Sequence, residues 1–400
     1  MSKIPKIIII GGGPTGLMTA AQLRDLNAHI TIVDHKSAVG RKFLVAGEGG
    51  FNLTHSEPLE SFLEKYDREI IRDWVSQFTP DDFRSWLKTI GIETYIGSSG
   101  KVFPLEGTKP IQVLNAWLEH LKSESIHWQL KSELVDFDAK TIRIKSKTEI
   151  QELPYDFLIF ALGGASWKKT GSDGKWFDLF NKKEIPLVPF QSGNTGLELK
   201  KSTWRSNFEG HFIKNCRLTI GDLTVAGDLV ITGYGIEGKP AYAVNRVLRN
   251  NHFKGLKIDF KPQLTHEKIE AILRSFTKVR KAFSQLKLND AIYYWLKEEL
   301  PKDQFTDPAL LAKQLKAFTI EVTGLRPLDE AISTVGGISM DAIDSSGQLK
   351  QWKNVFCCGE MLDWDAPTGG YLLQACVSSG YAVGQAIREE LSIMNAKIIK

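Results

Sequence analysis

Residues 6–34 read KIIIIGGGPTGLMTAAQLRDLNAHITIVD, and this stretch decides the fold. Four consecutive isoleucines over 7–10 run directly into glycines, which is typical of a strand that is buried on both faces and ends at a tight turn. Gly11, Gly13 and Gly16 fit the spacing G-x-G-x-x-G: the first glycine makes the turn, the second lets the backbone approach a pyrophosphate, and the third lets the next helix pack on the strand. The stretch predicts a dinucleotide site, with an ordinary glycine-rich strand–helix turn as the alternative.

The residues after these glycines complete the unit. A helix is predicted over 14–26, and Pro14 suits its first turn because the missing N–H would have no partner there. Its N-terminal amides, including that of the candidate contact Thr15, would face the phosphates. A second strand over 29–33 ends at Asp34, which can accept hydrogen bonds from the adenosine ribose. Because an acid here disfavours a 2′-phosphate, FAD or NAD is favoured over NADP.

The composition describes an ordinary globular chain with room for two or three domains. It has 400 residues, of which 42% are hydrophobic and 24% charged, and its net charge is +4. The near balance of charge gives no support for nucleic-acid binding. No apolar run is long enough to span a bilayer, and the first strand begins too early for a signal peptide. The chain has four cysteines, and their spacing matches no metal site: Cys216, Cys357, Cys358 and Cys376. This cysteine usage is consistent with the reducing environment of a cytoplasm.

The loop after Asp34 is rich in glycine and is expected to wrap a ligand. Arg41 and Lys42 are candidates for contact with phosphate or adenine, with solvated surface charges as the alternative. Asn52 and Thr54 are polar groups that can reach a ring edge. Close backbone approach or a positive φ is expected at Gly47, Gly49 and Gly50.

The rest of the first domain mixes helices and strands. A strand over 127–137, which contains the candidate contact Val135, and its partner over 141–147 form a predicted β-meander. A buried strand over 156–162 leads to Gly163, which would lie beside the ligand crevice of a doubly wound sheet. Residues 97–110 are predicted as loop and turn. Helices are predicted over 58–66, 69–77, 80–90 and 111–122.

From about residue 190 the pattern changes to short alternating strands, and then to a helical stretch over 265–318. Tyr294 and Trp295 in that stretch are expected to be core residues. A second G-x-G-x-x-G at 233–238 has no acid-terminated strand after it, so a turn is favoured over a second nucleotide site. The predicted organisation is an FAD-binding domain over 1–190 and 325–400, interrupted by an antiparallel β domain over 191–262 and a helical subdomain over 263–324.

The C-terminal part returns to an α/β pattern. A strand over 355–358 ends in Gly359 and Glu360, and a glycine pair then opens a long apolar helix. The amides at Gly369, Gly370, Tyr371 and Leu372 would point toward a ligand. In a flavoprotein such a helix end can stabilise the anionic reduced flavin at its pyrimidine edge. For Glu360, an ordinary surface acid is the alternative.

These segments together resemble the glutathione-reductase-type FAD fold. The resemblance is carried by GGGPTG at 11–16, FLIFALGG at 157–164 and FCCGEMLDWDAPTGGYLLQACVSSGYAVG at 356–384. The match is closer to the bacterial BaiN/YhiN-like flavoproteins, which include aminoacetone oxidase and show G-R-K followed by a glycine-rich loop ending in Asn-Leu-Thr. The resemblance covers nearly the whole chain and implies an FAD-dependent oxidoreductase.

Two departures place the chain in a divergent subgroup. The family loop commonly reads Gly-Arg-Cys-Asn, whereas residues 49–52 read GGFN. The insert commonly carries His-x-Gly-x-Ser-Gly-Pro, whereas residues 233–239 read GYGIEGK. Chemistry that other members perform through those side chains does not transfer to this chain.

Several functions stay open at this stage. The leading hypothesis is a non-covalent FAD enzyme that oxidises a small amine and passes electrons to O₂. The first alternative is a reductase that takes hydride from transiently bound NAD(P)H and reduces an enone-type acceptor. A flavin-bearing RNA-modifying or RNA-binding protein is a further alternative, which the near-neutral charge disfavours. His55, His211 and Tyr234 are weak candidates for acid–base catalysis, and the oligomeric state is open.

Overall fold

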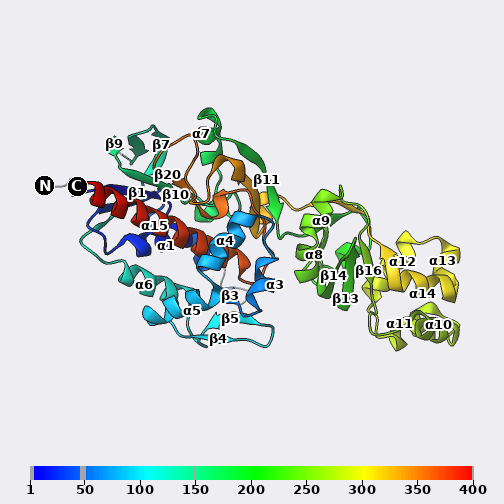
Figure 1. The fold of residues 1–400 in the computed structure, drawn as a ribbon. Coiled ribbons are helices and arrows are strands. Elements are labelled where there is room, and N and C mark those ends of the chain that lie inside the picture. Colours follow the sequence, from blue (N-terminus) through cyan, green and yellow to red (C-terminus); the bar gives the residue numbers. More distant parts are fainter. Residues whose placement is uncertain (1–3, 46–50, 148, 399–400) are drawn as a thin grey trace. The chain divides into compact units, whose positions relative to one another are not determined.

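The computed structural model describes residues 4–45, 51–147 and 149–398. The chain folds as two units, one formed by residues 1–191 with 333–400 and the other by residues 192–332 (Figure 1). The second unit reaches beyond the predicted boundary at residue 324, because β18 (Val322–Leu325) pairs with β12 (Leu197–Leu199) of the insert.

A parallel five-stranded sheet is the centre of the first unit. Its strand order is β20-β10-β1-β2-β6, and β20 pairs in parallel with β10, as the prediction that both ends of the chain share one sheet requires. Ile7 and Ile9 have no exposed surface. The strands are β1 (Lys6–Ile10), β2 (His29–Asp34), β6 (Ile126–Leu130), β10 (Phe157–Phe160) and β20 (Val355–Cys357).

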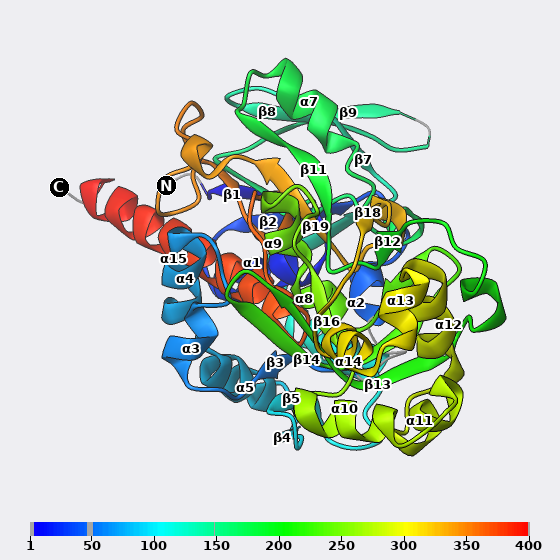
Figure 2. The ribbon, with the colours of Figure 1, turned by 90° about the vertical axis from the view of Figure 1, so that its right-hand side faces the viewer.

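Two helices from opposite ends of the sequence pack together beside this sheet. Helix α15 (Tyr371–Ile398) runs alongside α1 (Pro14–Leu23), as Figures 1 and 2 both show. The approach is close enough that the Thr19 hydroxyl donates to the Gly380 carbonyl at 3.1 Å. Although α15 is long, no helix among the described residues is both long and apolar enough to cross a membrane.

The segment predicted as one strand over 127–137 is two strands. The chain turns at Lys131, which has a φ of 55°. The amides of Lys131 and Ser132 donate to the carbonyls of Lys36 and Asp34, so the turn is fixed to the end of β2. Only the first half therefore joins the parallel sheet, and the second half begins a meander of β7 (Glu133–Phe137), β8 (Thr141–Lys145) and β9 (Ile150–Pro154).

The segment predicted as loop over 97–110 also contains a strand. β5 (Lys101–Pro104) pairs with β4 (Thr94–Ile96) and with β3 (Thr54–His55), so a small antiparallel sheet forms beside the helices. The remaining elements of this unit are α2 (Arg41–Val45), α3 (Leu59–Leu63), α4 (Glu69–Gln77), α5 (Pro80–Thr89), α6 (Pro110–His120), α7 (Trp176–Lys182), β11 (Leu187–Gly193) and β19 (Ser333–Ile338).

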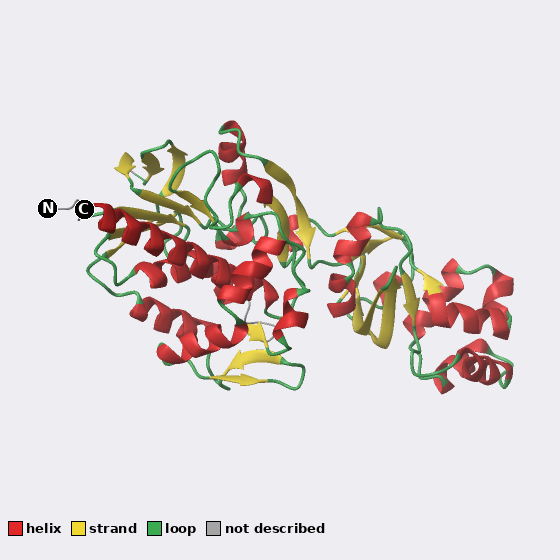
Figure 3. Ribbon diagram, in the orientation of Figure 1, coloured by secondary structure: helices red, strands yellow, loops and turns green. Residues whose placement is uncertain are grey.

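The second unit combines an antiparallel sheet with helices around one core (Figure 3). Trp295 lies in this core, but Tyr294 is 37% exposed and is not the core residue that was expected, because it falls on the outer side of its helix. Sheet order is β17-β16-β13-β14-β15-β12-β18. The other elements are β13 (Phe212–Ile220), β14 (Leu223–Ile231), β15 (Gly235–Glu237), α8 (Lys239–Ala243), α9 (Asn245–Asn250), β16 (Lys257–Asp259), α10 (His266–Arg274), α11 (Val279–Gln285), α12 (Asp290–Glu299), α13 (Lys302–Thr306), α14 (Pro308–Ala317) and β17 (Phe318–Thr319).

Candidate cofactor site

A cavity of about 380 Å³ lies in the first unit at the carboxyl ends of the parallel strands. In open α/β sheets this is the edge at which ligands bind. Segments that are far apart in the sequence form its wall: the β1–α1 turn, the ends of β2 and β10, part of β7, and Glu360, which follows β20. Ten of the predicted site residues line it: Gly11, Gly13, Pro14, Thr15, Asp34, Arg41, Lys42, Val135, Gly163 and Glu360.

The glycine-rich turn has two crowded positions and one open position. Gly11 has a φ of 111°, and a Cβ there would overlap the carbonyl of Ala161. A Cβ on Gly16 would overlap the carbonyl oxygen of Gly11. At Gly13, by contrast, a Cβ would meet no atom of the described part of the chain within 4 Å, although this residue lines the cavity. The turn thus leaves space beside the first amides of α1, and this space fits a phosphate group.

Asp34 supports the same turn. Its carboxylate accepts hydrogen bonds from the amide of Gly12 at 2.9 Å and from the amide of Lys36 at 2.8 Å. Each carboxylate oxygen has a second acceptor position, so the predicted bond to a ribose hydroxyl is still compatible with this geometry. Sequence reasoning had assigned only the ligand contact and had missed the structural bond to Gly12.

Lys42 and Glu360 form an ion pair within the cavity wall. The Lys42 ammonium lies 2.6 Å from Oε2 and 2.8 Å from Oε1 of Glu360, and 3.0 Å from the Ser166 hydroxyl. Glu360 is only 6% exposed, so it is not a surface acid. The neighbouring Arg41 is exposed and lines the same cavity.

The start of α15 is formed by two glycines with positive φ. Gly369 has a φ of 119° and Gly370 a φ of 100°, and a Cβ on Gly370 would lie 2.6 Å from Cα of Thr54. The hydroxyl group of Tyr371 donates a hydrogen bond to the carboxylate of Glu57. The phenol of Tyr371 is therefore engaged within the protein, and the contact of the backbone amides at this helix end with a ligand stays a prediction.

Eight predicted residues lie outside the cavity lining. Gly16 and Gly359 are packing positions, since a Cβ on Gly359 would overlap the Thr15 side chain. Residues 47, 49 and 50 are outside the described part of the chain. The eight residues are Gly16, Asn52, Thr54, Gly359, Gly369, Gly370, Tyr371 and Leu372.

Sequence reasoning missed one residue of the wall, Ser172, and one residue that supports the wall, Thr334. Ser172 lines the cavity, and its buried hydroxyl has no hydrogen-bond partner among the described residues, as expected for a group that meets a ligand. Thr334 accepts hydrogen bonds from the amides of Ala165 and Ser166 at 2.8 and 3.0 Å, and its own amide donates to Glu360. No motif marks either residue, because each is brought to the site by the tertiary fold.

The weak catalytic candidates do not line the cavity. His55 Nδ1 accepts from the amide of Glu57, and Nε2 lies 3.0 Å from the Ser99 carbonyl, so both ring nitrogens are occupied. Tyr234 donates to Glu237 under the guanidinium of Arg326. His211 and Tyr234 belong to the second unit.

Cys376 does line the cavity, but it is not a reactive thiol. Burial raises the pKa of the Cys376 thiol to about 12, so the thiolate is not populated near neutral pH.

Comparison with known proteins identifies relatives that extend over nearly the whole chain. A 3-dehydro-bile acid delta(4,6)-reductase of Clostridium scindens is 26% identical and covers 96% of this chain and 99% of its own. A ribosomal RNA dihydrouridine synthase of Haemophilus influenzae is 23% identical and covers 98% of this chain and 100% of its own. Among solved structures, the open conformation of a flavocytochrome c3 fumarate reductase has a TM-score of 0.52 at 14% identity and covers 96% of this chain and 78% of its own, which shows a shared fold.

The family model described as HI0933-like protein Rossmann domain matches residues 5–386. The predicted resemblance and the predicted Rossmann-type fold are therefore confirmed. This chain belongs to the HI0933-like family and is an FAD-dependent oxidoreductase.

Proposed function

We propose that this protein binds FAD non-covalently and uses NAD(P)H to reduce a carbon–carbon double bond that is conjugated to a carbonyl group. One observation carries the choice of reaction: the names of the two kinds of relative both describe the reduction of a carbon–carbon double bond. A bile acid Δ(4,6)-reductase and a dihydrouridine synthase both saturate a carbon–carbon double bond that is conjugated to a carbonyl group. The overall reaction consumes NAD(P)H and one proton and yields NAD(P)⁺ and the saturated carbonyl compound.

Residues of the cavity have defined roles in this proposal. The amides that follow Gly13 bind the diphosphate, and Asp34 accepts a hydrogen bond from the ribose while it supports the turn through Gly12. Outside the cavity lining, the first amides of α15 would stabilise negative charge at the pyrimidine edge of a bound flavin. Bound FAD would supply the hydride chemistry, and the chain supplies binding, orientation and electrostatics.

Anaerobic flavin spectroscopy tests this proposal against the amine-oxidase hypothesis, which stays a prediction. The FAD-loaded protein is mixed without oxygen with NADH, with NADPH or with small amines, and then with a 3-keto-4-ene steroid or with air. We expect bleaching by a reduced nicotinamide and recovery of the yellow colour with the unsaturated ketone. Bleaching by amines alone, with recovery only in air, would favour an oxidase instead.

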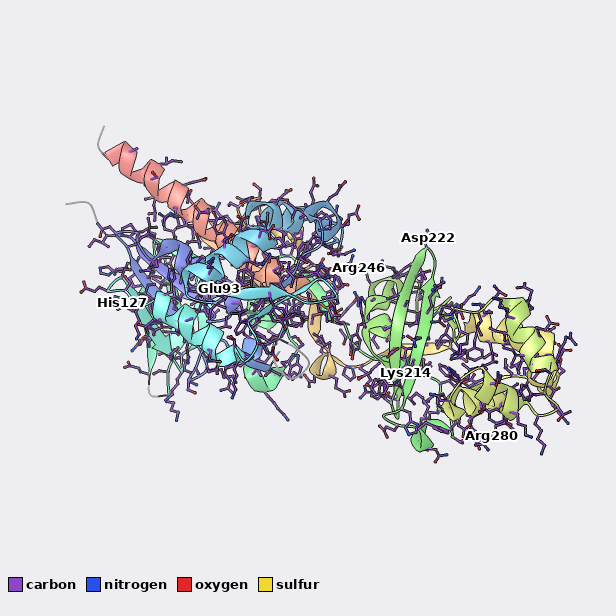
Figure 4. All side chains as sticks on the ribbon, turned by 90° about the horizontal axis from the view of Figure 1, so that it is seen from below. Glu93, His127, Lys214, Asp222, Arg246 and Arg280 are labelled. Carbon is purple, nitrogen blue, oxygen red and sulfur yellow. The ribbon has the colours of Figure 1, made fainter. Side chains whose placement is uncertain are left out.

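The distribution of charge supports an RNA uridine as a second candidate substrate. The second unit contains 22 lysines and arginines against 16 aspartates and glutamates, whereas the first contains 29 against 31. The near-neutral total therefore combines a basic insert with a slightly acidic remainder, and Lys214 and Arg280 are exposed residues of that insert (Figure 4). Binding of a uridine-rich RNA that weakens steeply with salt would support this candidate.

A further inference from the structure

The ion pair between Lys42 and Glu360 brings together segments that are 318 residues apart. Both side chains belong to the first unit and line the same cavity as the glycine-rich turn. Glu360 is held from the other side by the amide of Thr334, which donates to Oε1 at 3.1 Å. The carboxylate is therefore fixed in place and largely shielded from water.

The hydrogen bonds of Lys42 leave little capacity for a phosphate contact. An ammonium group has three donors. Its nitrogen lies within 3.0 Å of both carboxylate oxygens of Glu360 and of the Ser166 hydroxyl. The predicted role of Lys42 as a direct phosphate or adenine contact therefore requires that it give up bonds to a buried carboxylate.

The carboxylate lies close to where a diphosphate is expected. Gly359, which precedes it, packs against the side chain of Thr15 in the first turn of α1. Thr15 and Glu360 both face the cavity. A diphosphate at the start of α1 would add negative charge to a cavity that already contains a buried carboxylate, and like charges repel strongly where water is excluded.

We propose that Lys42 is a positioning residue that neutralises Glu360 and so allows an anionic cofactor to bind beside it, without itself contacting the diphosphate. This proposal rests on the proposed FAD site. Removal of the lysine would leave the carboxylate buried and unpaired, whereas simultaneous replacement of the glutamate would remove the repulsion. A direct phosphate contact would behave differently, because no change at residue 360 could restore it.

A double-mutant cycle on FAD affinity distinguishes these roles. Wild-type protein, Lys42→Met, Glu360→Gln and the double variant are stripped of flavin and titrated with FAD by fluorescence. We expect Lys42→Met to weaken binding on the order of tenfold or more, as truncation of one partner of a buried charge pair does. Glu360→Gln should bind about as tightly as wild type, and the double variant should recover most of the loss.

Lys175→Met is the matched control. Lys175 also lines the cavity, but its ammonium is paired with Asp173 at 3.4 Å and its side chain is 72% exposed. Its effect on FAD affinity should be small and should be the same in the presence and absence of Glu360→Gln. A thermal unfolding midpoint for each stripped variant separates loss of binding from loss of fold.

Two results would overturn the proposal while the FAD site stands. One is a double variant that binds as weakly as Lys42→Met, which would show a direct phosphate contact. The other is a large loss of affinity in Glu360→Gln, a variant that keeps the side-chain shape and one acceptor oxygen for the lysine and that does not depend on Lys42→Met being folded. Failure of wild-type protein to bind FAD would instead remove the proposed function, and this inference with it.

Discussion

Gly13 and Gly16 are expected to respond to substitution in opposite ways, although they are three residues apart in one motif. A Cβ at Gly16 would lie within 3.0 Å of the Gly11 carbonyl oxygen, a separation that real Cβ atoms essentially never show. Because the obstructing atom is backbone, it cannot rotate away. At Gly13 the residues that the structure describes offer no obstruction within 4 Å. Gly16 is therefore required by the fold, and Gly13 by the ligand.

The expected magnitudes follow from these contacts. For Gly16→Ala, overpacking costs roughly 1–3 kcal/mol, and the upper half of that range is expected because the obstructing atom is backbone. Better helix propensity returns up to about 1 kcal/mol, so a net loss of about 1 kcal/mol or more is expected. Gly13 has a φ of −80°, which valine adopts without strain, and its loss as N-cap costs roughly 1 kcal/mol or less. FAD affinity should nevertheless fall by roughly a hundredfold in Gly13→Val, which is about 2.7 kcal/mol, because the side chain occupies the space of phosphate approach.

Two measurements on each stripped variant test this pair of predictions. The thermal midpoint of Gly16→Ala should be lower than that of wild type by about 2 °C or more, and that of Gly13→Val should change less. A fluorescence titration should show the larger loss of FAD affinity in Gly13→Val. Equal FAD occupancy in Gly13→Val and wild type would refute the assignment of the turn, and an unchanged midpoint in Gly16→Ala would refute the packing argument.

Four further predictions address the rest of the first unit. Denatured protein should release FAD, detected by chromatography, and release of FMN would contradict the cofactor assignment. Asp34→Ala should weaken FAD binding less than Gly13→Val, measured by the same titration, because it removes hydrogen bonds without a steric clash. Gly370→Pro removes an amide and cannot adopt the φ of 100°, so an anaerobic titration with a redox dye should give a lower flavin potential; an unchanged potential at full occupancy would exclude a role for this helix end. Burial opposes ionisation of Asp136, but hydrogen bonds from Lys183 and Arg143 lower its pKa to about 2, so its stabilisation is present above about pH 4 and is lost as the pH falls through about 2. Acid unfolding of Asp136→Asn should accordingly vary less with pH in that range than acid unfolding of wild type.

Local patterns were enough to predict the centre of the fold. Four isoleucines followed by glycines specify a buried strand and a tight turn whatever surrounds them, and β1 has the bounds that this pattern implies. Cys357 and Cys358, in the segment predicted as a strand over 355–358, have no exposed surface. Such features depend on residues that are neighbours in the sequence.

Features that depend on distant residues could not be predicted. The split of the strand over 127–137 depends on bonds from Lys131 and Ser132 to the end of β2, and nothing in the local alternation indicates them. The pairing of Lys42 with Glu360 needs both ends of the chain in place. For the same reason Ser172 carries no signal in the sequence, although its hydroxyl is one of the better-placed polar groups of the wall.

The order of strands in the parallel sheet has a consequence for synthesis of the protein. β10 is bordered by β20, which lies beyond the whole insert, so its second neighbour emerges from the ribosome almost 200 residues later. The insert, residues 192–332, is complete before that strand appears and has its own core. We expect the insert to fold during translation, while one edge of β10 is still unpaired. A strand edge that stays exposed for so long is a site for aggregation or for chaperone binding. We therefore expect misfolding of the first unit, more than of the insert, to limit the yield of folded protein.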